Sequence, residues 1–305
     1  MDTTGESRTV EKRFLTIFIY LLAVAACLAL GACAVFNHPR FGKLPEGERL
    51  DLVQRSPNYR DGEFRYPIAT PVFSKDVGLL SVIWSNQFAT AEGLKPTAPI
   101  PAVKTDLKAL NPQQDAVVWL GHSSWFIQLG GKRILIDPVF SDYAAPFSFL
   151  NRAFAGTSIY GTEDMPEIDG LLISHDHWDH LDFPTVTALA SKVKQVICPL
   201  GVGAYFEQWG YPREKIHEGD WYDRVALAKD SFVHVLPARH YSGRLRTKNQ
   251  TLWAGFALET PGVRIFFSGD SGYGKHFSEV GAAFKGFDLA LLDCGSTTRV
   301  GPISI

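Results

Sequence analysis

The sequence predicts an α/β protein built as an αβ/βα sandwich, in which two sheets lie face to face and helices cover the outside. From about residue 116, short apolar runs bounded by turn residues alternate with segments of helical spacing. One run, Leu171–Ser174, is nearly all apolar, as expected of a strand covered on both faces. It leads directly into a cluster of histidine and aspartate, which places a candidate functional site at the end of a buried strand.

The length and composition are those of a folded protein with one large domain and an appendage. The chain has 305 residues, of which 46% are hydrophobic, and its formal net charge is −2. Nucleic-acid-binding proteins carry a basic patch or stripe, so this charge argues against nucleic acid as a partner.

The first 36 residues are predicted to be a signal or membrane-anchor segment. Phe14–Phe36 contains no charged residue, follows Lys12 and Arg13, and is long enough to cross a bilayer as a helix. It fits a retained anchor, a cleaved secretory signal, or a lipoprotein signal with Cys33 as the lipidated residue. A buried core helix is a fourth, less favoured interpretation. The body is expected to be membrane-associated and periplasmic or otherwise extracytoplasmic.

Residues 37–110 are predicted to form an arm that packs on the domain. Turn residues and prolines dominate this stretch, and only Val77–Phe88 has the spacing of a short helix. The aromatic residues are the expected anchors, although a lipid-facing edge is an alternative; they are Phe41, Phe64, Tyr66, Phe73 and Trp84.

The remaining residues, 111–305, are predicted to form the domain. The expected strands are Val117–Leu120, Trp125–Leu129, Arg133–Ile136, Leu171–Ser174, Val196–Cys198, Arg224–Leu227, Phe232–Leu236, Thr251–Glu259, Arg264–Ser268 and Leu289–Asp293. The expected helices are Phe183–Lys194, which opens near a proline, and Val202–Trp209, which ends at a glycine.

The stretch His175-Asp176-His177-Trp178-Asp179-His180 predicts a metal site. Imidazole and carboxylate together suit zinc and neighbouring transition metals. A turning backbone can aim the first two histidines one way and the last aspartate and histidine another. The spacing therefore favours two metals over one.

This motif and four further blocks resemble the metallo-β-lactamase fold superfamily. The order of these blocks and the residues within them are most similar to the branch that contains N-acylphosphatidylethanolamine-hydrolysing phospholipase D and its bacterial relatives. The further blocks are Val118–Trp125, Gly131–Pro138, Ala238–His240 and Phe266–Tyr273. The resemblance implies the four-layer αβ/βα sandwich of that family.

The resemblance also implies a ligand set and a mechanism. It assigns His175, His177 and His240 to a first metal, and Asp179 and His180 to a second, with Asp270 as the bridge. Zinc is the expected metal, with one or two ions per chain, and another transition metal is an alternative. Asp179 and Asp270 are the expected catalytic carboxylates. Two cations about 3.5–4 Å apart can share a hydroxide that attacks the substrate.

Further polar residues are candidates for contacts with the metal ligands or the substrate: His122, Asp137, Asp182, Arg244, Arg246, Tyr273 and His276. Asp182 is expected either to orient a ligand imidazole or to cap the helix that follows it. The two arginines are expected either to hold a phosphate or to be solvated at the surface.

The chain departs from the superfamily near its C-terminus. Members supply one more histidine to the second metal there, followed by a helix and a strand, and this sequence has neither the histidine nor a helical pattern. We therefore expect the last C-terminal elements of the fold to be lacking and the second metal site to be weakened. Cys294 is a possible substitute ligand.

The predicted function is a metal-dependent hydrolase that uses a metal-bound hydroxide, acting as a phosphodiesterase on N-acyl phospholipid-like substrates. A lactonase or other ester hydrolase of the same fold is the first alternative. A chain with an impaired second metal site and little catalysis is the second. Oxidoreductase chemistry with iron ranks last.

Overall fold

The computed structural model describes residues 3–68, 96–147, 151–244 and 247–294. The chain divides into two compact units, residues 1–42 and 43–305.

The first unit is dominated by one long helix, α1 (Thr3–Phe36), followed by a single 3-10 turn, η1 (Pro39–Phe41). The segment Thr16–Phe36 has 21 residues and a mean hydropathy of 2.5, so it is long and apolar enough to cross a membrane. None of this segment is buried. A signal sequence meets the same criteria. The apolar helix therefore agrees with the predicted segment without deciding between signal and anchor.

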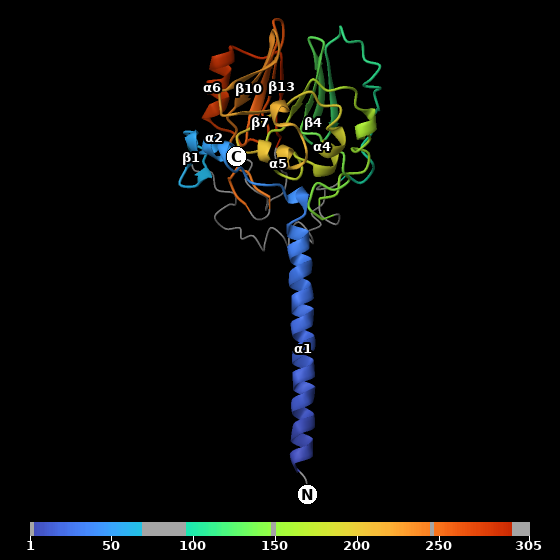
Figure 1. Ribbon diagram of the computed structural model, residues 1–305. Helices are drawn as coiled ribbons and strands as arrows, with labels where there is room; N and C mark the ends of the chain where they lie inside the picture. The colour runs from blue at the N-terminus through green and yellow to red at the C-terminus, as the bar shows by residue number, and fades with distance from the viewer. Residues whose placement is uncertain (1–2, 69–95, 148–150, 245–246, 295–305) are drawn as a thin grey trace. The chain divides into compact units, whose positions relative to one another are not determined.

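The second unit contains two large sheets (Figure 1). The first has the order β3 (Ala116–Gly121), β4 (Ser124–Leu129), β5 (Lys132–Ile136), β6 (Gly170–Leu172), β7 (Val196–Pro199) and β8 (Ile216–Gly219). The second has the order β13 (Leu289–Leu291), β12 (Arg264–Phe267), β11 (Gly255–Glu259), β10 (Ser231–Leu236) and β9 (Arg224–Ala228). The pairs from β5 to β8 are parallel, so their carboxyl ends meet along one edge of the first sheet.

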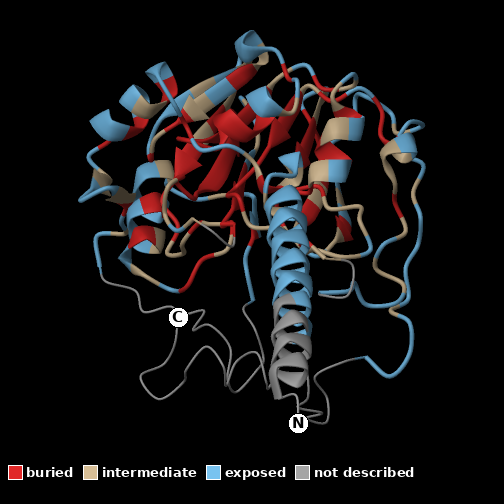
Figure 2. Ribbon diagram, turned by 60° about the horizontal axis from the view of Figure 1, so that its bottom comes forward, coloured by how far each residue is buried: buried red, intermediate tan, exposed pale blue. Residues whose placement is uncertain are grey.

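Side-chain alternation along the strands builds three apolar layers. Ile127 on β4 and Leu172 on β6 face Val235 and Phe256 of the other sheet in the central core. The preceding residue on each strand points outward, so Phe126 and Leu171 belong instead to the core under the helices of the first sheet. Buried residues accordingly concentrate in the two sheets (Figure 2).

Helices cover both outer faces. α4 (Phe183–Leu189) and α5 (Gly203–Gln208) contribute buried residues to the outer core of the first sheet. α6 (Lys275–Phe284) packs Val280 and Phe277 on the outer face of the second. The order helix, sheet, sheet, helix confirms the predicted αβ/βα sandwich.

Some elements are shorter than predicted. The helix predicted over 183–194 stops at Leu189, because Val193 instead pairs with Ile168 beside the first sheet. The strand predicted over 251–259 begins only at Gly255, although the residues before it are buried.

Other elements were not predicted: α2 (Glu48–Arg55), the hairpin β1 (Tyr59–Arg60) and β2 (Glu63–Phe64), the 3-10 turns η2 (Thr162–Asp164) and η3 (Arg213–Lys215), β8 and α6. α2 illustrates the reason. It is a polar helix whose buried Arg49 binds Glu207 and Glu218, so its support comes from residues far away in the sequence.

The arm is described only in part. Phe64 is fully buried in the core between the sheets, and Tyr66 packs against the same core. Phe73, Trp84 and the helix predicted over 77–88 lie outside the described residues. The boundaries predicted at residues 36 and 110 remain predictions.

Candidate metal centre

The histidine-rich loop begins where β6 ends, in the middle of the first sheet. β6 lies between β5 and β7 and all three of its residues are buried. Because the loop continues directly from this buried strand, its residues His175 and His180 are buried as well.

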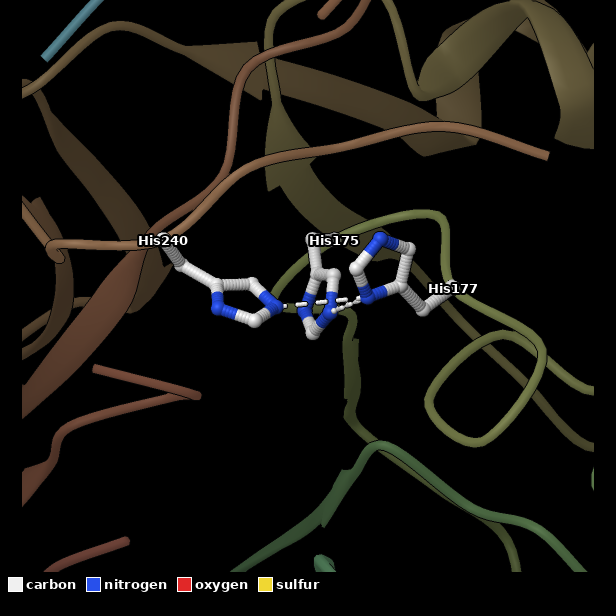
Figure 3. Close-up of side chains that lie close together, drawn as sticks. All are labelled: His175, His177 and His240. Carbon is white, nitrogen blue, oxygen red and sulfur yellow. Dashed lines mark hydrogen bonds between the residues drawn. The ribbon is translucent and has the colours of Figure 1, made fainter. Parts of the chain in front are cut away.

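Three imidazoles form a first group (Figure 3). His175 Nε2 lies 2.8 Å from His177 Nδ1, and His240 Nε2 lies 3.2 Å from the same nitrogen. His240 comes from the segment after β10, so the second sheet supplies this ligand. Two nitrogens bound tetrahedrally to zinc at about 2.0–2.1 Å would be about 3.3 Å apart. The three nitrogens therefore converge on one point, all within 4.8 Å of one another, and form a candidate site for a cation.

The electrostatics of this group also fit a cation. Burial is the main cause that lowers the pKa of His175 and of His177, and it lowers the pKa of His240 to about 3. Imidazoles with such pKa values are neutral at pH 7. Neutral imidazole is the form that binds a metal.

Asp270 lies between this group and His180. Its Oδ1 is 3.2 Å from His180 Nε2, and its Oδ2 is 3.6 Å from His240 Nε2. The preceding Gly269 has φ +59°, and a Cβ there would lie 2.4 Å from the carbonyl oxygen of Ala254. Only glycine fits this turn, which directs the carboxylate towards both groups.

Asp179 and His180 form a second group with His122. His122 Nε2 lies 3.1 Å from Asp179 Oδ2, and the ligand atoms of the three residues lie within 4.8 Å of one another. Burial opposes the charge of Asp179, but the hydrogen bond from His122 and the charge of His180 outweigh it and lower its pKa. Burial also opposes the charge of Asp270, but the positive charge of His180 outweighs this effect and lowers the pKa of Asp270 to about 2.

His180 is placed in a site that favours positive charge. Burial disfavours its cationic form, yet Asp270, Asp137 and Asp179 raise its pKa well above the usual value. Although Asp270 is near, the buried Nε2 makes no hydrogen bond within the described part of the chain. A divalent cation at this nitrogen would supply the positive charge that the carboxylates favour.

Asp137 holds His180 from behind. Its fully buried carboxylate accepts hydrogen bonds from the backbone N–H and the hydroxyl of Ser174, at 2.7 and 2.5 Å, and lies 2.8 Å from His180 Nδ1. A carboxylate at Nδ1 leaves Nε2 directed at the site. The structure thus places Asp137 directly behind the candidate ligand His180.

Arg244 does not lie at the surface, where one of its two predicted positions would place it. It is buried, so the surface alternative is wrong, and its guanidinium stacks 4.3 Å from the Trp178 ring. It donates to the backbone carbonyls of Asp176, near the start of the metal-binding motif, and of Leu181, directly after its end. Arg244 therefore clamps the loop that carries the candidate ligands. Arg246 lies outside the described residues.

The sequence interpretation missed the other half of this clamp. The Asp176 carboxylate accepts hydrogen bonds from the Tyr205 hydroxyl and the Gly243 backbone N–H, at 2.9 and 2.7 Å. Asp176 therefore faces away from the cation groups. No signal in the sequence distinguishes it from its neighbour Asp179, because only the tertiary fold brings Tyr205 to it.

Asp182 and Tyr273 make other contacts. Asp182 is the N-cap residue of α4, but its carboxylate accepts hydrogen bonds from the Ser141 and Thr185 hydroxyls instead of from a helix N–H, and it orients no imidazole among the described residues. Tyr273 is 80% exposed and stacks on Phe277.

His276 lies behind the Asp270 segment and is buried. Its Nε2 is 3.0 Å from the Ser271 hydroxyl, and its Nδ1 is 2.9 Å from the Tyr66 hydroxyl. It thus links the arm to the residue that follows Asp270. Cys294 is exposed and belongs to none of the candidate metal groups within the described ranges.

Comparisons with known proteins agree with this architecture. Residues 132–303 match the beta-lactamase superfamily domain. An uncharacterized protein of Mycobacterium tuberculosis is 38% identical over 252 residues, which cover 82% of this chain and 68% of that protein.

Two named relatives are similar over a shorter region. The N-acyl-phosphatidylethanolamine-hydrolyzing phospholipase D 1 of Caenorhabditis elegans is 30% identical over 188 residues, which cover 58% of this chain and 53% of that enzyme. The mitochondrial enzyme of the same name from Saccharomyces cerevisiae is 35% identical over 185 residues, which cover 58% of this chain and 39% of that enzyme. The match therefore spans about half the length of these two relatives, or less.

The chain belongs to the beta-lactamase superfamily, which confirms the resemblance seen in its motifs. It has the metallo-β-lactamase fold, with histidine and aspartate groups suited to metal binding.

Proposed function

We propose that this protein is a two-metal phosphodiesterase that hydrolyses N-acyl phospholipid-like substrates. Zinc is the proposed metal. The ligands would be His175, His177 and His240 for one cation and Asp179 and His180 for the other, with Asp270 shared. The observation that carries the proposal is the position of Asp270, whose two oxygens face His180 and His240 at 3.2 and 3.6 Å.

The residues around the site would have different roles in the reaction. When bound, two cations supply the Lewis acidity that activates water and stabilises charge on the phosphoryl oxygens. Asp270 and Asp179 provide the negative charge that holds both cations close together. Asp137 keeps Nε2 of His180 directed into the site, and Arg244 keeps the loop in place.

An apolar pocket beside the second group supports a lipid-like substrate. Its volume is about 460 Å³, and His122 and Asp179 form part of its wall. Trp119, Leu120 and Phe154 contribute apolar surface to it. A pocket of this kind would bind an apolar chain and hold the ester group against the ligands.

The names of the two phospholipase relatives and the apolar helix α1 also support a membrane substrate. We propose that this segment tethers the protein to a membrane, either as an anchor or through a lipid on Cys33. The substrate would then reach the pocket from the bilayer that carries the protein.

The test is hydrolysis by the full chain loaded with zinc. Vesicles that contain N-acyl phosphatidylethanolamine should yield phosphatidic acid and an N-acyl ethanolamine, and His177→Ala should abolish the release. His217→Ala, which changes an exposed histidine on β8, is the matched control. Turnover of lactones in preference to phosphodiesters would replace this proposal with the lactonase alternative.

A further inference from the structure

His122 lies in an unusual turn between β3 and β4. The pairing register of the two strands shifts between Trp119 and Gly121. Gly121, at the end of β3, and His122, in the turn itself, have positive φ, +111° and +43°. Positive φ is uncommon for residues other than glycine, and such residues cluster at functional sites. A register shift of this kind re-aims the side chains that follow it.

Neighbouring groups hold this turn in its strained form. The indole N–H of Trp119 donates a hydrogen bond of 2.7 Å to the backbone carbonyl of His122. A Cβ at Gly121 would lie 2.8 Å from the carbonyl oxygen of Thr157, so the position accepts only glycine. The conformation of His122 is therefore imposed by the fold.

The turn aims the imidazole at the second ligand group. His122 Nε2 lies 3.1 Å from Asp179 Oδ2, and the rings of His122 and His180 are 5.5 Å apart. The distance of 3.1 Å is close to the separation of about 3.3 Å between two ligand atoms on tetrahedral zinc. A cation that binds Asp179 and His180 would thus be within reach of a third protein ligand.

We propose that His122 Nε2 is a ligand of the second cation, together with Asp179 and His180. This assignment extends the ligand set of the proposed function and depends on a cation being bound in this group. The side chain is 54% exposed, so the cation can enter or leave on this side of the group without passing through the core. The chemistry of two imidazoles and a carboxylate suits zinc and cobalt.

The test uses cobalt, whose visible spectrum reports its ligands. The full chain, His122→Asn and the control His217→Ala would be titrated with Co²⁺, and bound metal would be counted by elemental analysis after dialysis. Asparagine tolerates positive φ, so this variant keeps the turn and removes the imidazole. Equal unfolding midpoints of the metal-free proteins would show that the fold is unchanged.

We expect two cobalt ions in the wild type and in His217→Ala. In His122→Asn the second ion should bind at least tenfold more weakly, with an altered spectrum, while the first remains. A second ion that binds His122→Asn with wild-type affinity and spectrum would overturn the assignment of His122 alone. A wild-type chain that binds fewer than two ions would instead contradict the proposed two-metal function.

Discussion

The two candidate ligand groups differ in charge and in exposure. The first consists of three imidazoles that burial keeps neutral. The second combines an anionic carboxylate, a histidine in a site that favours positive charge and a histidine that is half exposed. The first group is thus suited to hold a cation permanently. The second is suited to exchange its cation, and two of its residues line the apolar pocket.

The largest effect should follow from damage to the first group. His177 contacts both of the other imidazoles, so His177→Ala should remove the cation and lower kcat/KM by about a thousandfold or more, since this Lewis acidity is worth several kcal/mol. Steady-state kinetics and metal analysis together check this. A variant that keeps two metals and normal turnover would show that the first group is not the permanent site.

Arg244 supports both groups at once. Arg244→Lys retains the charge but cannot reach the carbonyls of Asp176 and Leu181 together. We expect the metal-free protein to lose about 2–4 kcal/mol of unfolding free energy, because buried charge-assisted hydrogen bonds are lost. Chemical denaturation measures the loss. Unchanged stability would mean that the loop is held by other contacts.

A substitution of Asp137 should affect the two ligand groups differently. Asp137→Asn keeps the shape of the side chain but weakens the support of His180, so affinity for the second cation should fall by about 10–100-fold while the first is retained. Isothermal titration with zinc resolves the two binding steps. Equal weakening of both steps would contradict the separation.

The smallest expected effect is that of a substitution in the apolar pocket. Phe154 is partly exposed on the pocket wall, and Phe154→Ala should raise KM for a long-chain substrate about fivefold, equivalent to about 1 kcal/mol of lost apolar contact. The metal content should not change. An equal rise in KM for a substrate without an acyl chain would show that the pocket does not bind the chain.

The sequence was enough to predict the sandwich and the loop at the end of β6. Both depend on local patterns, namely apolar runs of strand length and six residues of unusual composition. It did not predict the clamp around Arg244 or the strained turn at His122. Those features depend on residues that meet only in the fold, such as Tyr205 beside Asp176 and Thr157 beside Gly121.

The most direct test of two cation sites is a crystal structure of the zinc-loaded full chain with diffraction data at the zinc absorption edge. We expect two anomalous peaks, one among His175, His177 and His240, and one beside Asp179 and His180, with Asp270 between them. A single peak, or two peaks away from these residues, would contradict the account.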